Sequence, residues 1–504
     1  MPLPVSQPVS GRWKALLFIG IAQLMVVLDG TIVNIALPAA QRDLGFSDGD
    51  RQWVVTAYAL AFGGLLLFGG RIADLWGRKR AFTVGVIGFA VASALGGAAV
   101  DTGMLLGARA LQGAFGALLA PAALSLITVM FTEPKERAKA LGVYGAIAGA
   151  GGAVGLLLGG VLTEYANWRW TLFVNVFFAV VAAAGAILLI HDPASDRKGG
   201  SRLDIPGVLL ACTGLVSLVY GFTRVETDGW HAPVTIGLLI AAVVLLAAFV
   251  ATESRVKAPL LPLRVVGDRS RGGAYAAVAV STIGMFGLFL FLTFYLQVVL
   301  GYSPVVTGVA FLPMVAGMMI GSTQIGARLT PRMAPRLLMA PGYLLAAAGL
   351  AILAQIKVDS SYISVVLPGM VLMGLGLGTA MMPAMNLATH GVQPQDAGVA
   401  SAMVNTSQQV GGAIGVALLN TVATSSTAAY TRDHLHAAAS PKAAGILELQ
   451  AMVHGYATAI RWSAGFLVLA ALVTLALIDH RHPEATGDPV AAQPAVEDEP
   501  VTAP

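Results

Sequence analysis

The sequence is poor in the residues on which most enzymes and metalloproteins depend. Its 504 residues include a single cysteine, Cys212, which excludes an intramolecular disulfide and any metal site built from several cysteines. It contains no Gly-x4-Gly-Lys-Ser/Thr phosphate-binding loop and no His-Glu-x-x-His motif, which are signatures of ATPases and zinc hydrolases. We therefore expect that the protein is not an enzyme and needs no cofactor.

Charge is scarce as well. Only 11% of the residues are charged and 57% are hydrophobic, whereas ordinary soluble domains carry about 25% charged residues. This composition predicts an integral membrane protein. A net charge of +4 would suggest nucleic-acid binding in a soluble chain, but here the cations lie between apolar segments, where membrane topology explains them.

Apolar segments long enough to cross a bilayer, for which about 20 residues are needed, recur along the whole chain. They form a set of six, a pair and a second set of six. The sequence therefore predicts an all-α integral membrane protein with fourteen transmembrane helices. The predicted helices span 15–37, 53–69, 81–100, 104–128, 140–162, 171–190, 205–223, 234–251, 273–298, 305–327, 337–355, 363–383, 398–422 and 457–478.

The lysines and arginines predict the orientation. With both termini in the cytoplasm, most of the 30 cations fall in cytoplasmic loops and tails, as the positive-inside rule requires. We expect an outer loop at 424–455 with a short helix near 444–452. The predicted organisation is a cytoplasmic N-terminus at 1–14, six-helix bundles at 15–190 and 272–478, a linker with two extra helices at 191–271, and a disordered cytoplasmic tail at 479–504.

The most distinctive stretch is a short basic turn between the second and third predicted helices. It reads Gly-Arg-Ile-Ala-Asp-Leu-Trp-Gly-Arg-Lys-Arg at 70–80, and its two glycines allow a tight reversal because glycine adopts positive φ without strain. The stretch resembles the signature loop of the major facilitator superfamily, although Leu75 replaces a usually basic residue. The alternative is a turn whose charges only fix topology. The resemblance implies a latch at the cytoplasmic side made by Gly70, Asp74, Gly77, Arg78 and Lys79.

Asp29 lies inside the first predicted helix, in Leu-Asp-Gly-Thr-Ile-Val-Asn-Ile-Ala-Leu-Pro. A charge in hydrocarbon costs several kcal/mol, so this carboxylate should face the bundle interior or a water-filled cavity and mark a transport pathway. The stretch resembles the first-helix motif of the drug:proton antiporters. That resemblance implies that Asp29 binds a proton or a cationic substrate, whereas the alternative is a structural carboxylate paired to a neighbour.

Arg109 is the only cation within the fourth predicted helix, in Arg-Ala-Leu-Gln-Gly-Ala-Phe-Gly. This segment resembles a superfamily motif, Arg-x-x-Gln-Gly-x-Gly, that is associated with proton coupling. The first helix runs outward and the fourth inward, so Asp29 and Arg109 both fall in the outer half of the membrane, where they can pair. Reorganising the pair would release and rebind a proton; a fixed ion pair that joins two helices is the alternative.

A row of glycines in the fifth predicted helix offers a groove for a neighbouring helix. Gly151, Gly155 and Gly159 recur at i, i+4, which allows close helix approach. The row resembles a glycine motif of antiporters, with Leu156 in the place of its proline, and the resemblance implies a packing hinge. Ordinary helix packing is the alternative.

Several amide side chains within the predicted helices are candidates for a polar substrate cavity. The segment 405–415 resembles the matching segment of fourteen-span exporters, which usually has an arginine where Gln408 stands. The amides either line a pocket or bond across helices. The candidates are Asn34, Gln112, Asn175, Gln297, Asn386, Asn405, Gln408 and Gln409.

Over residues 13–480 the chain resembles the fourteen-span drug:proton antiporters of the EmrB/QacA type. The resemblance implies a transporter of the bacterial inner membrane that uses the proton gradient to export amphiphilic or cationic drugs by alternating access. We expect a monomer whose partners are small molecules, protons and lipid, with no nucleic acid; a periplasmic adaptor stays open. The alternatives are a dedicated exporter of an endogenous antibiotic, lipid or peptide, and a non-transporting membrane sensor.

Overall fold

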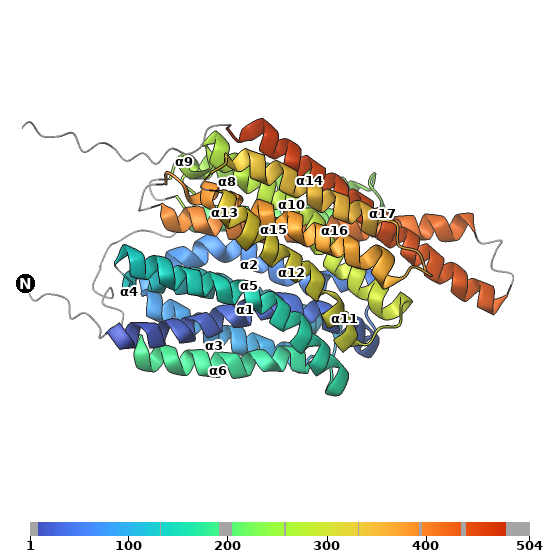
Figure 1. Ribbon diagram of the computed structural model, residues 1–504, viewed down its shortest axis with the longest axis horizontal. Helices are drawn as coiled ribbons and strands as arrows, with labels where there is room; N and C mark the ends of the chain where they lie inside the picture. Colours follow the sequence, from blue (N-terminus) through green and yellow to red (C-terminus); the bar gives the residue numbers. More distant parts are fainter. Residues whose placement is uncertain are drawn as a thin grey trace, which may run out of the picture.

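The computed structural model describes residues 9–131, 133–190, 204–256, 259–330, 332–392, 396–434 and 440–479, and within these ranges the backbone is helical apart from short turns (Figure 1). Thirteen of its helices are long and apolar enough to cross a membrane. A fourteenth helix, α5 (Pro134–Tyr165), contains a shorter apolar segment, Ala150–Tyr165. The all-α membrane fold with fourteen transmembrane helices is confirmed.

Six helices form the first bundle, in the lower half of Figure 1. Within it, α4 packs against α2 and α3, and α1 packs against α5 and α6. The helix bounds, besides α5, are α1 (Val9–Leu44), α2 (Asp48–Trp76), α3 (Arg78–Gly97), α4 (Thr102–Met130) and α6 (Trp170–Leu189).

Two further helices, α7 (Ile205–Asp228) and α8 (Pro233–Glu253), pack against each other. In addition, α7 lies against α2 of the first bundle and against α16 of the second. By contrast, α8 exposes a row of aliphatic side chains that includes Ile240, Val243 and Val244, as expected of a helix that faces lipid. These are the two extra helices that the sequence predicts.

Most of the remaining helices lie in the upper half of Figure 1 and form the second bundle. Within it, α14 packs against α15 and α17, and α10 packs against α16 and α17, whereas α11 reaches down to α5 of the first bundle. The predicted helix at 305–327 is divided. Its second segment begins at Leu312 and has Pro313 in its first turn, where proline is tolerated although it cannot donate the backbone bond that a continuous helix needs. The elements are α9 (Leu263–Val266), α10 (Arg269–Phe294), η2 (Tyr295–Val299), α11 (Pro304–Ala310), α12 (Leu312–Ile320), η3 (Gly321–Gly326), α13 (Ala327–Leu329), α14 (Pro335–Leu353), η4 (Tyr362–Val366), α15 (Leu367–Thr389), α16 (Ala397–Asp433) and α17 (Pro441–Leu477).

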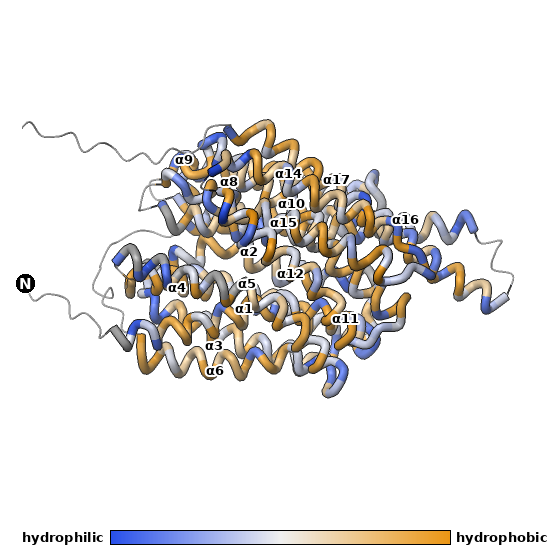
Figure 2. The backbone as a smooth tube through the Cα atoms, viewed as in Figure 1, coloured by the Kyte–Doolittle hydropathy of each residue, from blue (hydrophilic) through white to orange (hydrophobic). Residues whose placement is uncertain are grey.

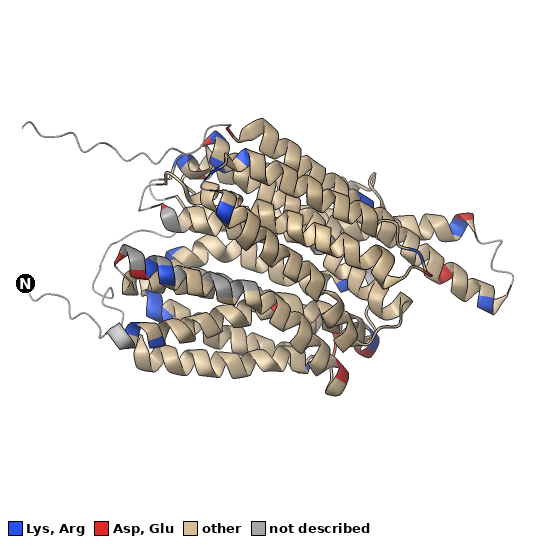
Figure 3. Ribbon diagram, viewed as in Figure 1, with Lys and Arg blue, Asp and Glu red and all other residues tan. Residues whose placement is uncertain are grey.

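Hydrophobic residues dominate the middle of the bundle and hydrophilic ones its two ends (Figure 2). Lysine and arginine residues are most frequent at the end where α1 begins and α17 finishes (Figure 3). By the positive-inside rule this is the cytoplasmic end. The opposite end, where α1 finishes and α2 begins, is called the outer end below.

The outer loop expected at 424–455 is wrong in its extent. Instead α16 continues to Asp433 and α17 begins at Pro441, and both project beyond the other helices at the outer end (Figure 1). The two helices hold each other there, since the hydroxyl of Ser426 donates to that of Thr458 at 3.2 Å. The apolar part of a sequence indicates where a helix contacts lipid, but a helix continues into water where residues with adequate helix propensity follow. The predicted ends of the membrane segments are therefore not the ends of α16 and α17.

Parts of the two predicted terminal segments and of the predicted linker lie outside the described residues. The N-terminal residues 1–8, the linker residues 191–203 and the tail from 480 onward lie outside the described residues. The division into two bundles and a linker at the predicted residues therefore stays a prediction. Within the predicted linker, the structure adds the short helix α9 ahead of the second bundle.

Candidate functional site

The structure brings Asp29 of α1 and Arg109 of α4 together in the interior of the first bundle. The Nη1 atom of Arg109 lies 2.6 Å from Oδ2 of Asp29, and both side chains are fully buried. The predicted proximity of the two residues is therefore observed. A buried pair of this kind is costly to break on one side, by about 3–5 kcal/mol, because the remaining charge is left without a partner.

Two amides complete the surroundings of the carboxylate. Gln112 donates from Nε2 to Oδ1 of Asp29 at 2.9 Å, and Asn175 of α6 donates to the same oxygen at 2.7 Å. Gln112 also accepts from Arg109 at 2.9 Å and donates to the hydroxyl of Ser93 at 2.7 Å. Gln112 and Asn175, which the sequence predicts as cavity residues, thus donate hydrogen bonds to the Asp29 carboxylate.

The guanidinium of Arg109 has further partners on α2. Its Nε donates to the backbone carbonyl of Val54 at 2.9 Å, and its Cζ lies 4.5 Å from the centre of the Tyr58 ring. The ring and the carbonyl favour the cation independently of Asp29. Arg109 can therefore keep part of its stabilisation if Asp29 becomes neutral.

Sequence reasoning missed Ser93, Val54 and Tyr58. Serine and tyrosine are common in membrane helices, and a backbone carbonyl leaves no trace in the sequence. The site takes residues from five of the first six helices, α1 to α4 and α6. We call Asp29, Arg109, Gln112, Asn175 and Ser93 the Asp29 cluster.

The Asp29 cluster is closed off toward the outer end. The cavity beside Arg109 on that side measures about 10 Å³ and is lined mainly by apolar side chains, among them Leu37, Leu105 and Trp168. That volume holds roughly one water molecule. The space beside Arg109 on this side is therefore small and mainly apolar.

The glycine row of α5 packs on the part of α1 that carries Asp29. A Cβ atom at Gly155 would lie 3.1 Å from the carbonyl oxygen of Leu28, and one at Gly159 would lie 3.0 Å from that of Ile32. Glycine therefore permits the two backbones to approach beside the Asp29 cluster. This is helix packing as the sequence predicts; the hinge role stays a prediction.

The residues of the predicted cytoplasmic latch lie around the α2–α3 turn. Gly77 has φ of 93°, which confirms the tight reversal, and Gly70 lies against Pro121 of α4. Lys79 donates to the carbonyl of Ile187 on α6 at 2.9 Å. Arg78 lies beside Gly77 at the start of α3, and the side chain of Asp74 lies outside the described residues.

The other predicted cavity residues occupy separate environments. Asn34 donates to Gly30 within α1, and Gln297 donates across the two bundles to the carbonyl of Ile35 at 3.0 Å. On the second bundle, Asn405 bonds within α16 and Gln408 contacts the sulfur of a methionine on α15. Gln409 packs against Gly63 of α2, and Asn386 lies on α15.

Several contacts join the two bundles at the outer end. Arg51 of α2 donates to Asn420 of α16 at 3.2 Å and lies over the ring of Phe294, with its Cζ 4.2 Å from the ring centre. Glu164, at the end of α5, accepts from the backbone N–H of Val305 on α11 at 2.9 Å. These contacts, together with that of Gln297, close the molecule toward the outside.

The carboxylate of Glu164 predicts a pH dependence for its contact with α11. Hydrogen bonds from the Ser303 hydroxyl and from the Val305 N–H hold the pKa of Glu164 below its usual range. We expect the contact to persist above the usual glutamate pKa of about 4.3 and to be lost as the pH falls through the lowered value. Glu164→Gln should therefore widen the distance between spin labels on the outer ends of α5 and α11 at neutral pH.

The matched control for that measurement is Glu448→Gln, which removes an exposed carboxylate from α17 at the same end of the molecule. It should leave the distance unchanged. If Glu164→Gln and Glu448→Gln give the same distances as the unmodified protein, the Glu164 contact does not hold the outer end closed.

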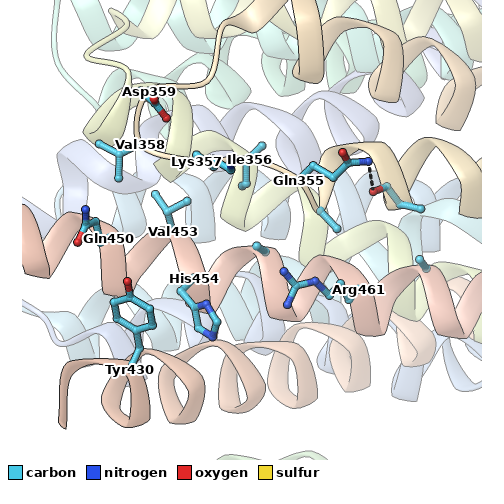
Figure 4. Close-up of a pocket in the computed structure, with 14 residues that line it drawn as sticks. Gln355, Ile356, Lys357, Val358, Asp359, Tyr430, Gln450, Val453, His454 and Arg461 are labelled. Atoms are coloured by element: carbon cyan, nitrogen blue, oxygen red, sulfur yellow. Dashed lines mark hydrogen bonds between the residues drawn. The ribbon is translucent and has the colours of Figure 1, made fainter. Parts of the chain in front are cut away.

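A second, larger cavity lies on the outer part of the second bundle (Figure 4). It measures about 1010 Å³ and is formed by the end of α14, residues 355–359, and the outer parts of α16 and α17. Its lining includes Lys357, His454 and Arg461 but none of the predicted cavity residues. The large cavity is therefore not the predicted substrate site.

Comparison with known proteins decides the family. A family model described as Major Facilitator Superfamily matches residues 19–416. The chain belongs to the major facilitator superfamily. It is also 56% identical over 472 residues to the puromycin resistance protein of Streptomyces alboniger, covering 93% of this chain and 92% of that protein. The cephamycin export protein of Amycolatopsis lactamdurans is 39% identical over 407 residues, which are 81% of this chain and 84% of that one.

A solved structure supports the fold at lower sequence identity. The bacterial homologue of the human lysosomal transporter Spinster superposes with a TM-score of 0.66 at 18% identity, covering 95% of this chain and all of that one. The superfamily consists of transporters rather than enzymes. The chain is accordingly a multi-pass efflux transporter of the bacterial cell membrane, as the resemblance implies.

Proposed function

We propose that this superfamily member uses the proton gradient to export antibiotics, and that the Asp29 cluster is its proton-binding site. The observation that carries the proposal is the fully buried carboxylate of Asp29, held by Arg109 and two amides inside a membrane bundle. Burying an ionisable group at this depth is costly, so its presence indicates a function. We further propose that the protein works as a monomer without a bound cofactor.

The hydrogen bonds of the cluster support a simple exchange of partners. When Asp29 takes up a proton, its attraction for Arg109 falls, while the guanidinium keeps Gln112, the Val54 carbonyl and the Tyr58 ring. The Oδ1 atom of Asn175 is buried without a hydrogen-bond partner. A rotated amide would let that atom accept from the new carboxyl O–H, so that the protonated state is satisfied too.

The exchange would be coupled to the outer closure through α1. Asp29 lies on this helix, which packs against the glycine row of α5 and carries the Ile35 carbonyl that binds Gln297. Opening the outer end must release Gln297, Arg51 and Glu164 from their partners. That opening would give a proton access to Asp29, and closing would deliver it toward the cytoplasm in exchange for substrate.

The names of the relatives guide the choice of substrate. Proteins named for puromycin resistance and for cephamycin export share most of this chain's length. They support export of an antibiotic, with puromycin as the first compound to test. They also favour the second candidate function, a dedicated exporter with a narrow substrate range, over a non-transporting sensor.

The test is drug accumulation in a bacterial strain that lacks its own major exporters. We would compare puromycin with a panel of lipophilic cations and neutral drugs, with and without a protonophore. Proton-driven export is supported if the protein lowers drug accumulation and the protonophore returns accumulation to the level of cells without the protein. If only puromycin responds in this way, the dedicated exporter is supported. Unchanged accumulation of every compound by correctly inserted protein would contradict the proposal.

A further inference from the structure

Two buried carboxyl groups meet at the cytoplasmic ends of the two extra helices. Asp204 caps the N-terminus of α7, and Glu253 is the last residue of α8. Their exposed fractions are 5% and 3%. Both residues lie far along the chain from the Asp29 cluster, and the export proposal does not use them.

Each carboxyl group binds backbone with one oxygen. Oδ1 of Asp204 accepts from the N–H of Gly207 at 2.9 Å, and Oε2 of Glu253 accepts from the N–H of Leu261 at 2.9 Å. The second contact joins the end of α8 to the segment that leads into the second bundle. The carboxyl groups thus connect three parts of the chain.

The other two oxygens face each other. Oδ2 of Asp204 and Oε1 of Glu253 are buried, and neither has a hydrogen-bond donor. A Cβ atom at Gly207 would lie 2.5 Å from the first and 2.7 Å from the second, so both converge on the space that this glycine leaves empty. Buried polar atoms are normally hydrogen-bonded, so these two adjacent carboxyl oxygens require a partner that both can bind.

No cation supplies the missing interaction among the described residues. The groups that face the pair are the two carboxyls themselves, from α7 and α8, and backbone N–H groups of the segment at 260–261. Arg255, the nearest described cation along the chain, is exposed. Two ionised carboxylates in one buried site would repel each other strongly.

The number of free oxygens favours a proton over a metal ion. Calcium takes six to eight oxygen ligands and magnesium near-octahedral coordination, whereas the described residues provide only two free side-chain oxygens here. One proton between them converts two acceptors into a donor and an acceptor and removes one negative charge. We propose that Asp204 and Glu253 bind a single proton between them, as a second proton site on the cytoplasmic side.

The shared proton keeps the start of α7, the end of α8 and the segment that leads into the second bundle in contact with one another. Loss of the proton leaves two buried negative charges, which favour separation of the helix ends. The connection between the two bundles therefore responds to cytoplasmic pH. This response is separate from proton binding at Asp29.

The test is infrared difference spectroscopy of the purified full-length protein at neutral pH, combined with thermal unfolding between about pH 5 and pH 9, the range that buried carboxyls cover. We expect a carboxylic-acid carbonyl band that disappears in Glu253→Gln and in Asp204→Asn. Both replacements are neutral and close in shape, and asparagine still caps a helix. We also expect the melting temperature to fall as the pH rises. Over this pH range the fall should be at least about 1.5 times as large in the unmodified protein as in Glu253→Gln.

Glu448→Gln, which changes an exposed carboxylate, is the control and should leave the band and the pH response unchanged. A band that persists in both variants, or identical pH responses in all three proteins, would overturn the proposal. Stabilisation by sodium, magnesium or calcium ions that is lost in Glu253→Gln would also overturn it, because it would assign the two oxygens to a metal ion.

Discussion

Replacing Asp29 by asparagine is expected to reduce pH-driven uptake of puromycin into inside-out vesicles to the background of empty membranes. Asparagine keeps the shape of the side chain but cannot take up a proton. It also leaves the Arg109 guanidinium without its anion, and breaking a buried pair in this way costs about 3–5 kcal/mol. The carbonyl of Val54 and the Tyr58 ring reduce that cost, so we expect folded protein with a lower melting temperature.

The matched control is Asn34→Ala on the same helix. Asn34 is buried, and within the described part of the chain its amide donates to the Gly30 carbonyl one turn away and to no other helix. This variant should keep most of the uptake. If Asp29→Asn transports as well as Asn34→Ala, Asp29 is a structural carboxylate and the proton site lies elsewhere.

Replacing Arg109 separates a coupling pair from a fixed structural pair. Arg109→Ala leaves the Asp29 carboxylate buried with only its two amide donors, so we expect a loss of about 3–5 kcal/mol in the free energy of unfolding and no transport. Arg109→Lys keeps the charge but loses the planar fork that reaches Asp29, Gln112 and Val54 together. We expect the Arg109→Lys variant to fold but to transport poorly.

The double variant Asp29→Asn/Arg109→Gln decides between the two roles. Removing both charges should recover about 0.5–3 kcal/mol of stability relative to the sum of the single changes, because neither charge is left unpaired. A proton-coupling role predicts that transport stays absent although stability returns. Recovered transport in the double variant would mean that the pair only joins α1 to α4.

The sequence could predict the Asp29–Arg109 contact because both residues are rare in their setting. A lone carboxylate and a lone guanidinium within apolar helices must find partners, and helix direction places them at the same depth. The same reasoning does not work for the amides. Gln112 and Asn175 bind Asp29, whereas Asn34 bonds within its own helix.

That difference depends on which face of each helix points inward. In a membrane helix every face is apolar, since lipid and neighbouring helices both accept aliphatic side chains, so the pattern carries little rotational information. The outer closure escaped prediction for a related reason. Arg51 and Glu164 stand at helix ends, where charged residues are ordinary, and only packing shows that they reach the other bundle.

The most direct test of the account is substrate-induced proton release from inside-out vesicles under an imposed pH gradient, with unmodified protein and Asp29→Asn. The account predicts that puromycin collapses the gradient with the unmodified protein and has no effect with Asp29→Asn at equal amounts of inserted protein. Collapse of equal size with both proteins would contradict the assignment of Asp29. No proton movement during measurable puromycin export would contradict proton coupling itself.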